Sequence, residues 1–103
     1  MNLKLLLRPD CTKVLSDCKS KKKILEQIAQ MASDQLPNHS CIDVLESLMN
    51  REKLGSTGIG NGIAIPHGRI TKGDKPVAVL LVTNKGVDYD AIDKRPVDIF
   101  CAL

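Results

Sequence analysis

The sequence predicts a single α/β domain, because segments with helical periodicity alternate with short apolar runs along the chain. Two stretches repeat apolar residues every three or four positions, as amphipathic helices do, and three apolar runs of strand length follow them. The 103 residues suffice for one domain, which we expect to span residues 1–103. This alternation predicts the class of fold but leaves the order of the strands open.

Two short segments precede the first predicted helix. Residues 3–7 form an apolar run that suits either a strand or a single helical turn. Residues 11–15 alternate in the way that a strand does.

Two helices are predicted next, each with a recognisable start. Ser20 suits the N-cap of a helix running to about residue 36, and Ser40 with Asp43 approximates a capping box for a helix running to about residue 53. His39 falls in the connection between them and is expected to be exposed. The apolar stripes expected to be buried are Ile24, Leu25, Ile28, Ala29, Ala32 and Leu36 in the first helix, and Ile42, Leu45, Leu48 and Met49 in the second.

Lysines fill the first turn of the first predicted helix, at positions 21 to 23. Positive charge there opposes the helix dipole. We interpret the run mainly as a solvated helix start. The alternative is a docking site for an acidic partner surface.

The second half predicts three strands. Residues 63–65 read as a short buried strand, residues 77–83 as a buried central strand, and residues 97–103 as the last strand. Residues 71–76 and 84–86 are expected to turn the chain, and residues 87–89 to begin a further strand.

The composition argues against several classes of function. The net charge is +3 and the aromatic residues are only Tyr89 and Phe100, so a nucleic-acid-binding module with base-stacking side chains is not expected. No apolar run approaches the ~18 residues of a membrane-spanning helix, and no signal peptide is recognisable. We therefore expect a cytoplasmic protein without membrane insertion.

No metal site is expected either. The four cysteines contain no Cys-x-x-Cys pair and are predicted to be reduced thiols: Cys11, Cys18, Cys41 and Cys101. The acids Asp88, Asp90 and Asp93 do not fit a calcium loop, because Ile92 stands where a ligand is needed.

The most distinctive stretch is residues 55–69, which holds five of the seven glycines. Its backbone amides could receive an anion, and Pro66 stiffens the chain directly before His67. Neither the Walker phosphate loop nor the dinucleotide fingerprint matches these glycines. From its position alone, His67 reads more readily as a structural or solvated histidine than as a chemical one. Arg51, shortly before the glycines, is equally an exposed residue at a helix end or a phosphate ligand.

A family resemblance favours the chemical interpretation. Arg-Glu-Lys-Leu at 51–54, followed by Gly-Ser-Thr-Gly-Ile-Gly-Asn-Gly-Ile-Ala-Ile-Pro-His-Gly-Arg, resembles the signature of the class-2 (fructose/mannitol-type) IIA domains of the bacterial phosphoenolpyruvate-dependent phosphotransferase system. Residues 18–23 and 90–98 resemble the nitrogen-regulatory branch of that family, and the resemblance covers essentially the whole chain.

The resemblance implies a three-layer α/β/α fold with a central mixed sheet. Family members continue beyond the equivalent of residue 103 with further helices and a second active-site histidine. This sequence ends before them, which we interpret as a C-terminal truncation. The missing helices would leave part of the sheet uncovered, and either homo-oligomers through that surface or poor solubility is expected.

The resemblance also implies a mechanism. His67 would accept a phosphoryl group from a phosphohistidine of an HPr-like phosphocarrier protein, without metal or cofactor, and its phosphorylation state would act on regulatory protein targets rather than on sugar transport. The groups expected to support the phosphate are Arg51, Ser56, Thr57, Gly58 and Gly60. Two other functions stay open: a non-catalytic interaction module whose incomplete site cannot be phosphorylated, and a general anion-binding domain.

Overall fold

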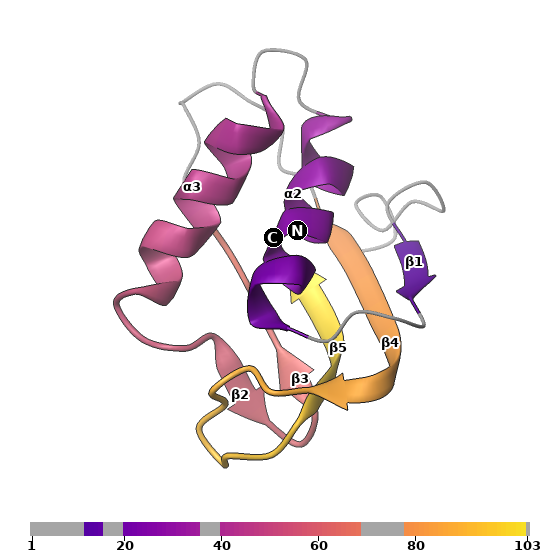
Figure 1. Cartoon of the computed structure of the whole chain (residues 1–103), viewed down its shortest axis with the longest axis vertical. Helices are drawn as coiled ribbons and strands as arrows, with labels where there is room; N and C mark the ends of the chain where they lie inside the picture. The colour runs from indigo at the N-terminus through magenta and orange to yellow at the C-terminus, as the bar shows by residue number, and fades with distance from the viewer. Residues whose placement is uncertain (1–11, 16–19, 36–39, 69–77, 103) are drawn as a thin grey trace.

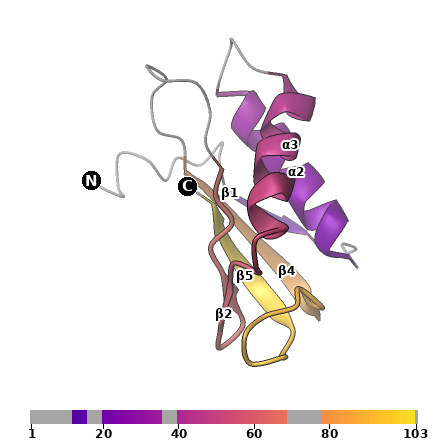
Figure 2. The ribbon, with the colours of Figure 1, turned by 90° about the vertical axis from the view of Figure 1, so that its left-hand side faces the viewer.

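The computed structural model describes residues 12–15, 20–35, 40–68 and 78–102. Its elements in chain order are β1 (Thr12–Leu15), α2 (Lys21–Ser33), α3 (Cys41–Glu52), β2 (Gly58–Gly60), β3 (Ile63–Ala64), β4 (Val79–Val87) and β5 (Val97–Ala102). The strands form one sheet in the order β1-β4-β5-β3-β2, and α2 and α3 pack side by side over one of its faces (Figures 1 and 2). The predicted α/β class is confirmed.

The sheet is mixed, as the resemblance implied. β1 runs parallel to β4 and β3 runs parallel to β5, whereas β4 and β5 are antiparallel and β2 and β3 are antiparallel. β5, the last of these strands in the chain, occupies the centre of the order. Within the described ranges no helix covers the second face of the sheet, so the structure has one helical layer there rather than two.

Both helices begin where the sequence predicts. The backbone N–H of Lys23 donates to Ser20 Oγ at 3.2 Å, which caps α2. Ser40 and Asp43 form a complete capping box at the start of α3, with bonds of 3.1 and 3.3 Å. α2 ends at Ser33 with Asp34 as its C-cap, earlier than predicted.

The buried stripe of α3 differs from the prediction, since Leu45 and Met49 are only partly buried against the core and Ile42 faces away from it. Ile42 was expected to be buried but is 73% exposed, whereas Val44 is buried. At 3.6 residues per turn, Ile42 lies about 200° around the helix from Val44 and so faces away from the core. Leu48, one turn after Val44, is buried as predicted.

The core lies between the helices and one face of the sheet. Leu81, Phe100 and Ala64 form a row across β4, β5 and β3 that faces α2 and α3. Tyr89 and Phe100, the two aromatic residues, are fully buried and meet edge to face at 5.4 Å between ring centres. An otherwise aliphatic core is thus centred on one aromatic pair.

β4 is longer than predicted. Residues 84–86 were expected to turn the chain, but β4 continues to Val87. Its register against β5 shifts between the pairs Val82–Ile99 and Val87–Val97, so the extra residues bulge out of the ladder instead of ending it. Gly86 permits this bulge, because a Cβ there would lie 2.4 Å from the Cβ of Pro96.

The face of the sheet without a described helix carries an apolar row, which we call the open-face row. It consists of Val14, Val82, Ile99 and Ile63, which are successive partners across β1, β4, β5 and β3. Val14 is 64% exposed and Ile99 is 39% exposed. Apolar side chains are therefore accessible on this face.

Several predictions lie outside the described residues. These are the apolar run at 3–7, the turn at 71–76, the burial of Leu36, the exposure of His39, and the states of Cys11 and Cys18. Cys41 and Cys101 are free thiols. None of the described helices is long and apolar enough to cross a membrane.

Candidate functional site

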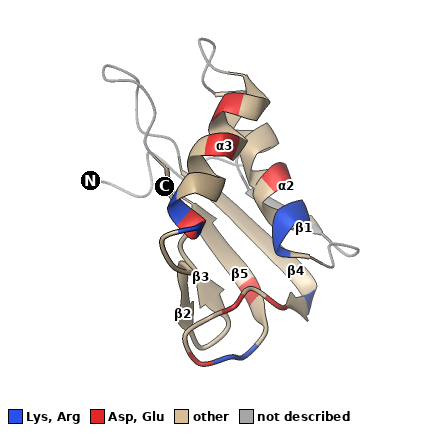
Figure 3. Ribbon diagram, turned by 60° about the vertical axis from the view of Figure 1, so that its left-hand side comes forward, with Lys and Arg blue, Asp and Glu red and all other residues tan. Residues whose placement is uncertain are grey.

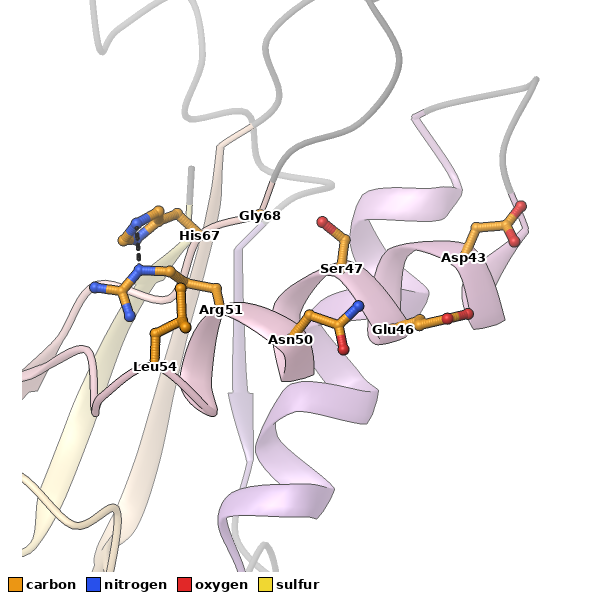
Figure 4. A pocket seen from close by; sticks show the side chains of 8 residues that line it. All are labelled: Asp43, Glu46, Ser47, Asn50, Arg51, Leu54, His67 and Gly68. Atoms are coloured by element: carbon orange, nitrogen blue, oxygen red, sulfur yellow. Dashed lines mark hydrogen bonds between the residues drawn. The ribbon is translucent and has the colours of Figure 1, made fainter.

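An open groove of about 570 Å³ separates α3 from the segment that follows β3. His67 and Gly68 form one side and residues of α3 and its C-terminal end form the other (Figure 4). The lining residues are Asp43, Glu46, Ser47, Asn50, Arg51, Leu54, His67 and Gly68.

His67 is held through both of its ring nitrogens. Nδ1 lies 3.0 Å from the carbonyl oxygen of Ile65, and Nε2 lies 3.1 Å from Nε of Arg51. A carbonyl oxygen can only accept, and an arginine N–H can only donate. The pattern therefore specifies the neutral ring with its proton on Nδ1 and a lone pair on Nε2, directed toward Arg51.

Local structure fixes both members of this pair. Arg51 lies in the last turn of α3, and its Nη1 donates to the carbonyl of Gly55 at 2.9 Å. On the other side, the N–H of Ile65 donates to the carbonyl of Thr57 at 2.9 Å, and Pro66 is fully buried. His67 therefore emerges exposed from a segment anchored on the residues just before it.

Gly68 brings this segment close to α3. A Cβ at Gly68 would lie 2.4 Å from Oγ of Ser47, closer than real Cβ atoms come, and 3.2 Å from the backbone carbon of the same residue, which is also tight. Glycine is thus needed here for a close approach of two backbones, rather than for an unusual φ angle. The approach sets the width of the groove next to His67.

Comparison with known proteins assigns this architecture. The family model described as "Phosphoenolpyruvate-dependent sugar phosphotransferase system, EIIA 2" matches residues 5–103. The chain belongs to the EIIA type 2 family. The resemblance deduced from residues 51–69 is confirmed.

Several relatives of this EIIA chain carry the name nitrogen regulatory protein. The one from Pseudomonas aeruginosa is 48% identical over 82% of this chain and 54% of its own length. The one from Klebsiella oxytoca is 44% identical over the whole of this chain and 64% of its own length. The crystal structure of nitrogen regulatory protein IIA-Ntr from Neisseria meningitidis superposes with a TM-score of 0.88 at 34% identity, covering 97% of this chain and 68% of that one. The EIIA chain thus spans roughly half to two thirds of these relatives.

The structure brings one of the predicted support residues of this EIIA chain to His67, namely Arg51. The other four do not line the groove. Ser56 donates its hydroxyl to the carbonyl of Tyr89 at 2.9 Å and accepts from the N–H of Gly58 at 3.1 Å. Thr57 directs both its N–H and its hydroxyl at the carboxylate of Glu52.

Three of the five glycines in residues 55–69 lie in a hairpin rather than an open loop, namely Gly58, Gly60 and Gly62. β2 pairs with β3, and the connection uses positive φ at Gly60, Asn61 and Gly62. A Cβ at Gly58 would lie 2.8 Å from Cα of Ala91. These glycines therefore serve the turn and the packing against residues 91–98, and their role as phosphate ligands stays a prediction.

Sequence reasoning missed the polar residues of α3 that line the groove. Asp43, Glu46, Ser47 and Asn50 lie on one side of the helix and continue to Arg51. Their spacing of three and four residues was the available signal. This spacing is equally typical of a solvent-exposed helix face. Only the position of His67 in the structure shows that this face of α3 lines a groove.

A buried carboxylate lies directly behind the site. Glu52 is 6% exposed at its side chain and its Oε2 pairs with Nζ of Lys21 at 2.7 Å, while Tyr89 donates its hydroxyl to Oε1 at 3.1 Å. Burial alone would raise the pKa of Glu52, but hydrogen bonds from Lys21 and Thr57 outweigh it and lower the pKa. Burial raises the pKa of Tyr89. Lys21, interpreted from the sequence as solvated or docking a partner, is engaged within the chain.

The described ranges contain no group of three or more side chains that could hold a metal ion. The acidic loop residues considered from the sequence serve the backbone instead. Asp93 accepts from the N–H groups of Arg95 and Asn61, both at 3.0 Å, and these bonds lower its pKa.

Proposed function

We propose that Nε2 of His67 accepts a phosphoryl group from the phosphohistidine of an HPr-like phosphocarrier protein in the cytoplasm. Its phosphorylation state would then control a protein target in nitrogen or related metabolism. The observation that carries the proposal is the hydrogen bond from Arg51 Nε–H to His67 Nε2. It places a lone pair and a permanent cation at one exposed point of the groove.

The transfer balances without a further reactant. The Nε2 lone pair attacks phosphorus, the new P–N bond forms as the P–N bond to the carrier histidine breaks, and that electron pair returns to the carrier ring. The proton on Nδ1 stays in place. The ring gains positive charge on phosphorylation, and the carbonyl of Ile65, 3.0 Å from Nδ1, stabilises that charge.

Arg51 changes its partner during this step. Before transfer, Nε–H of Arg51 donates to Nε2 of His67. After transfer, Nε2 of His67 is bonded to phosphorus and can no longer accept this hydrogen bond. The guanidinium carries five N–H donors, so it can turn from the ring to the phosphoryl oxygens without leaving the site. Charge spread over those oxygens in the transition state is what a positioned arginine stabilises.

The surroundings of the site suit a protein partner. Leu54 is 84% exposed at the groove, and acidic Asp43 and Glu46 extend from it along α3. Figure 3 shows acidic residues along α3 and a mixture of both charges at its C-terminal end. A carrier surface with an apolar contact point and basic residues would be complementary to this groove.

Intact-mass spectrometry tests the proposal. The chain is incubated with phosphoenolpyruvate, the general phosphotransferase enzyme and its phosphocarrier, and we expect an acid-labile gain of one phosphate. His67→Ala should abolish the gain, whereas His39→Ala, at the chain's other histidine, should keep it. A folded wild-type chain that gains no phosphate would refute the proposal and favour a binding module.

The open-face row favours a second property, self-association. We propose that two copies associate through the sheet face carrying Val82 and Ile99, because apolar side chains on a face that no described helix covers gain by burial against each other. Sedimentation should show concentration-dependent association that Ile99→Lys weakens. A wild-type chain that stays monomeric at high concentration would exclude it.

A further inference from the structure

The buried Glu52 carboxylate collects partners from three separate parts of the chain. Lys21 at the start of α2 forms the ion pair, Thr57 donates from the residue before β2, and Tyr89 donates from the residues after β4. Nζ of Lys21 also lies 4.6 Å from the centre of the Tyr89 ring. No buried side-chain polar atom of the described residues is left without a partner, so this network is complete.

The network leads directly to the histidine. Thr57 binds Glu52 through its N–H at 3.2 Å from Oε2 and 3.3 Å from Oε1, and through its hydroxyl. The carbonyl of the same residue accepts from the N–H of Ile65 at 2.9 Å, and the carbonyl of Ile65 holds Nδ1 of His67. Two backbone carbonyls therefore connect the Glu52 carboxylate to the imidazole.

The network also leads to the arginine. Glu52 is the residue after Arg51 and the last residue of α3, so an anchored Glu52 fixes the turn from which Arg51 extends. The hydrogen bond from Nη1 of Arg51 to the carbonyl of Gly55 holds the loop between α3 and Thr57 against the end of α3. One carboxylate thus fixes both sides of the Arg51–His67 pair, although it touches neither side chain.

We propose that Glu52, with Lys21 as its counter-ion, is a positioning residue that sets the tautomer and direction of His67 against Arg51. The Glu52 side chain is 6% exposed and that of Lys21 is 23% exposed, so desolvation of the carboxylate offsets part of their attraction and the pair is weak evidence for stability. A rigid, fully satisfied network is instead suited to holding a site in one geometry. The expected effect on the rate of phosphoryl transfer rests on the proposed function of His67. The expected effect on the tautomer of His67 does not.

The test therefore has two readouts. The ¹⁵N chemical shifts of the His67 ring report the tautomer without any phosphocarrier, and single-turnover phosphorylation reports the transfer rate. We expect Glu52→Gln and Lys21→Met to convert the single Nδ1–H tautomer into a mixture. We expect both to slow transfer by about tenfold to a hundredfold, the usual consequence of a small misplacement of reacting groups.

Matched controls separate positioning from a general change of charge. Glu26→Gln removes a carboxylate from α2, and Lys22→Met removes the exposed lysine next to Lys21. Both controls should keep the wild-type tautomer and rate. Tyr89→Phe removes the hydroxyl that donates to Glu52 Oε1 and lies 3.2 Å from Thr57 Oγ1, and it replaces Glu52→Gln in the test if that variant does not fold.

The outcomes are distinct. Folded Glu52→Gln, or folded Tyr89→Phe in its place, with the wild-type His67 spectrum would overturn the positioning role. A wild-type chain that is not phosphorylated, yet whose His67 spectrum changes in Glu52→Gln, would instead overturn the proposed function and leave the positioning intact.

Discussion

Arg51→Ala is expected to slow phosphoryl transfer to His67 by about a hundredfold to a thousandfold, the usual effect of losing one positioned donor to a developing anion. The variant removes the N–H that meets Nε2 at 3.1 Å and the only cation among the described residues that line the groove. Arg51→Lys should recover little of the rate, because an ammonium group cannot bind Gly55 and the site together as the planar guanidinium does.

The rate is measured by rapid-quench intact-mass spectrometry under single-turnover conditions. Arg95→Lys is the matched control, since Arg95 is exposed and lies outside the groove. A folded Arg51→Ala chain that reacts at the wild-type rate would remove Arg51 from the mechanism and leave His67 unassisted among the described residues.

Phe100→Ala should destabilise the fold by about 3–5 kcal/mol, the range for removing a buried aromatic ring from a core. Phe100 is fully buried on the central strand, and its ring packs edge to face on Tyr89. The free energy of unfolding of a domain is about 5–15 kcal/mol, so this loss would leave a protein that is only marginally stable.

Urea denaturation monitored by circular dichroism measures this change, and Ile99→Ala provides the comparison. Ile99 precedes Phe100 on the same strand but points to the open face, where it is 39% exposed. We expect a smaller loss there, about 1 kcal/mol, because less apolar surface leaves water on folding. Equal losses at the two positions, measured at low protein concentration, would contradict the assignment of the core to the helical face.

Features that depend on a few neighbouring residues were predictable from the sequence. The capping residues Ser20 and Ser40, the starts of both helices and the strands around residues 63 and 97 were recognised correctly. Each is determined by local hydrogen bonding or by an apolar run. The family signature around His67 was equally readable, since it is continuous in the chain.

Features that depend on a distant partner were not predictable. The bulge in β4 requires the close approach of Pro96 to Gly86, and the burial of Val44 in place of Ile42 depends on where α3 meets its neighbours. Ser56 and Thr57 have hydroxyl groups suited to phosphate, yet Tyr89 and Glu52 engage them. The sequence could not show which of several polar partners a side chain would meet.

The central position of β5 has a consequence for how the chain folds during its synthesis. β4 and β3 share no partner except β5, so a nascent chain that has emerged only to residue 96 holds two separate strand pairs, β1 with β4 and β2 with β3. During synthesis, β4 and β3 would each present an unpaired edge to chaperones and to other nascent chains. The segment leading to His67 follows β3, so the groove beside His67 would be completed only after β5 has emerged from the ribosome.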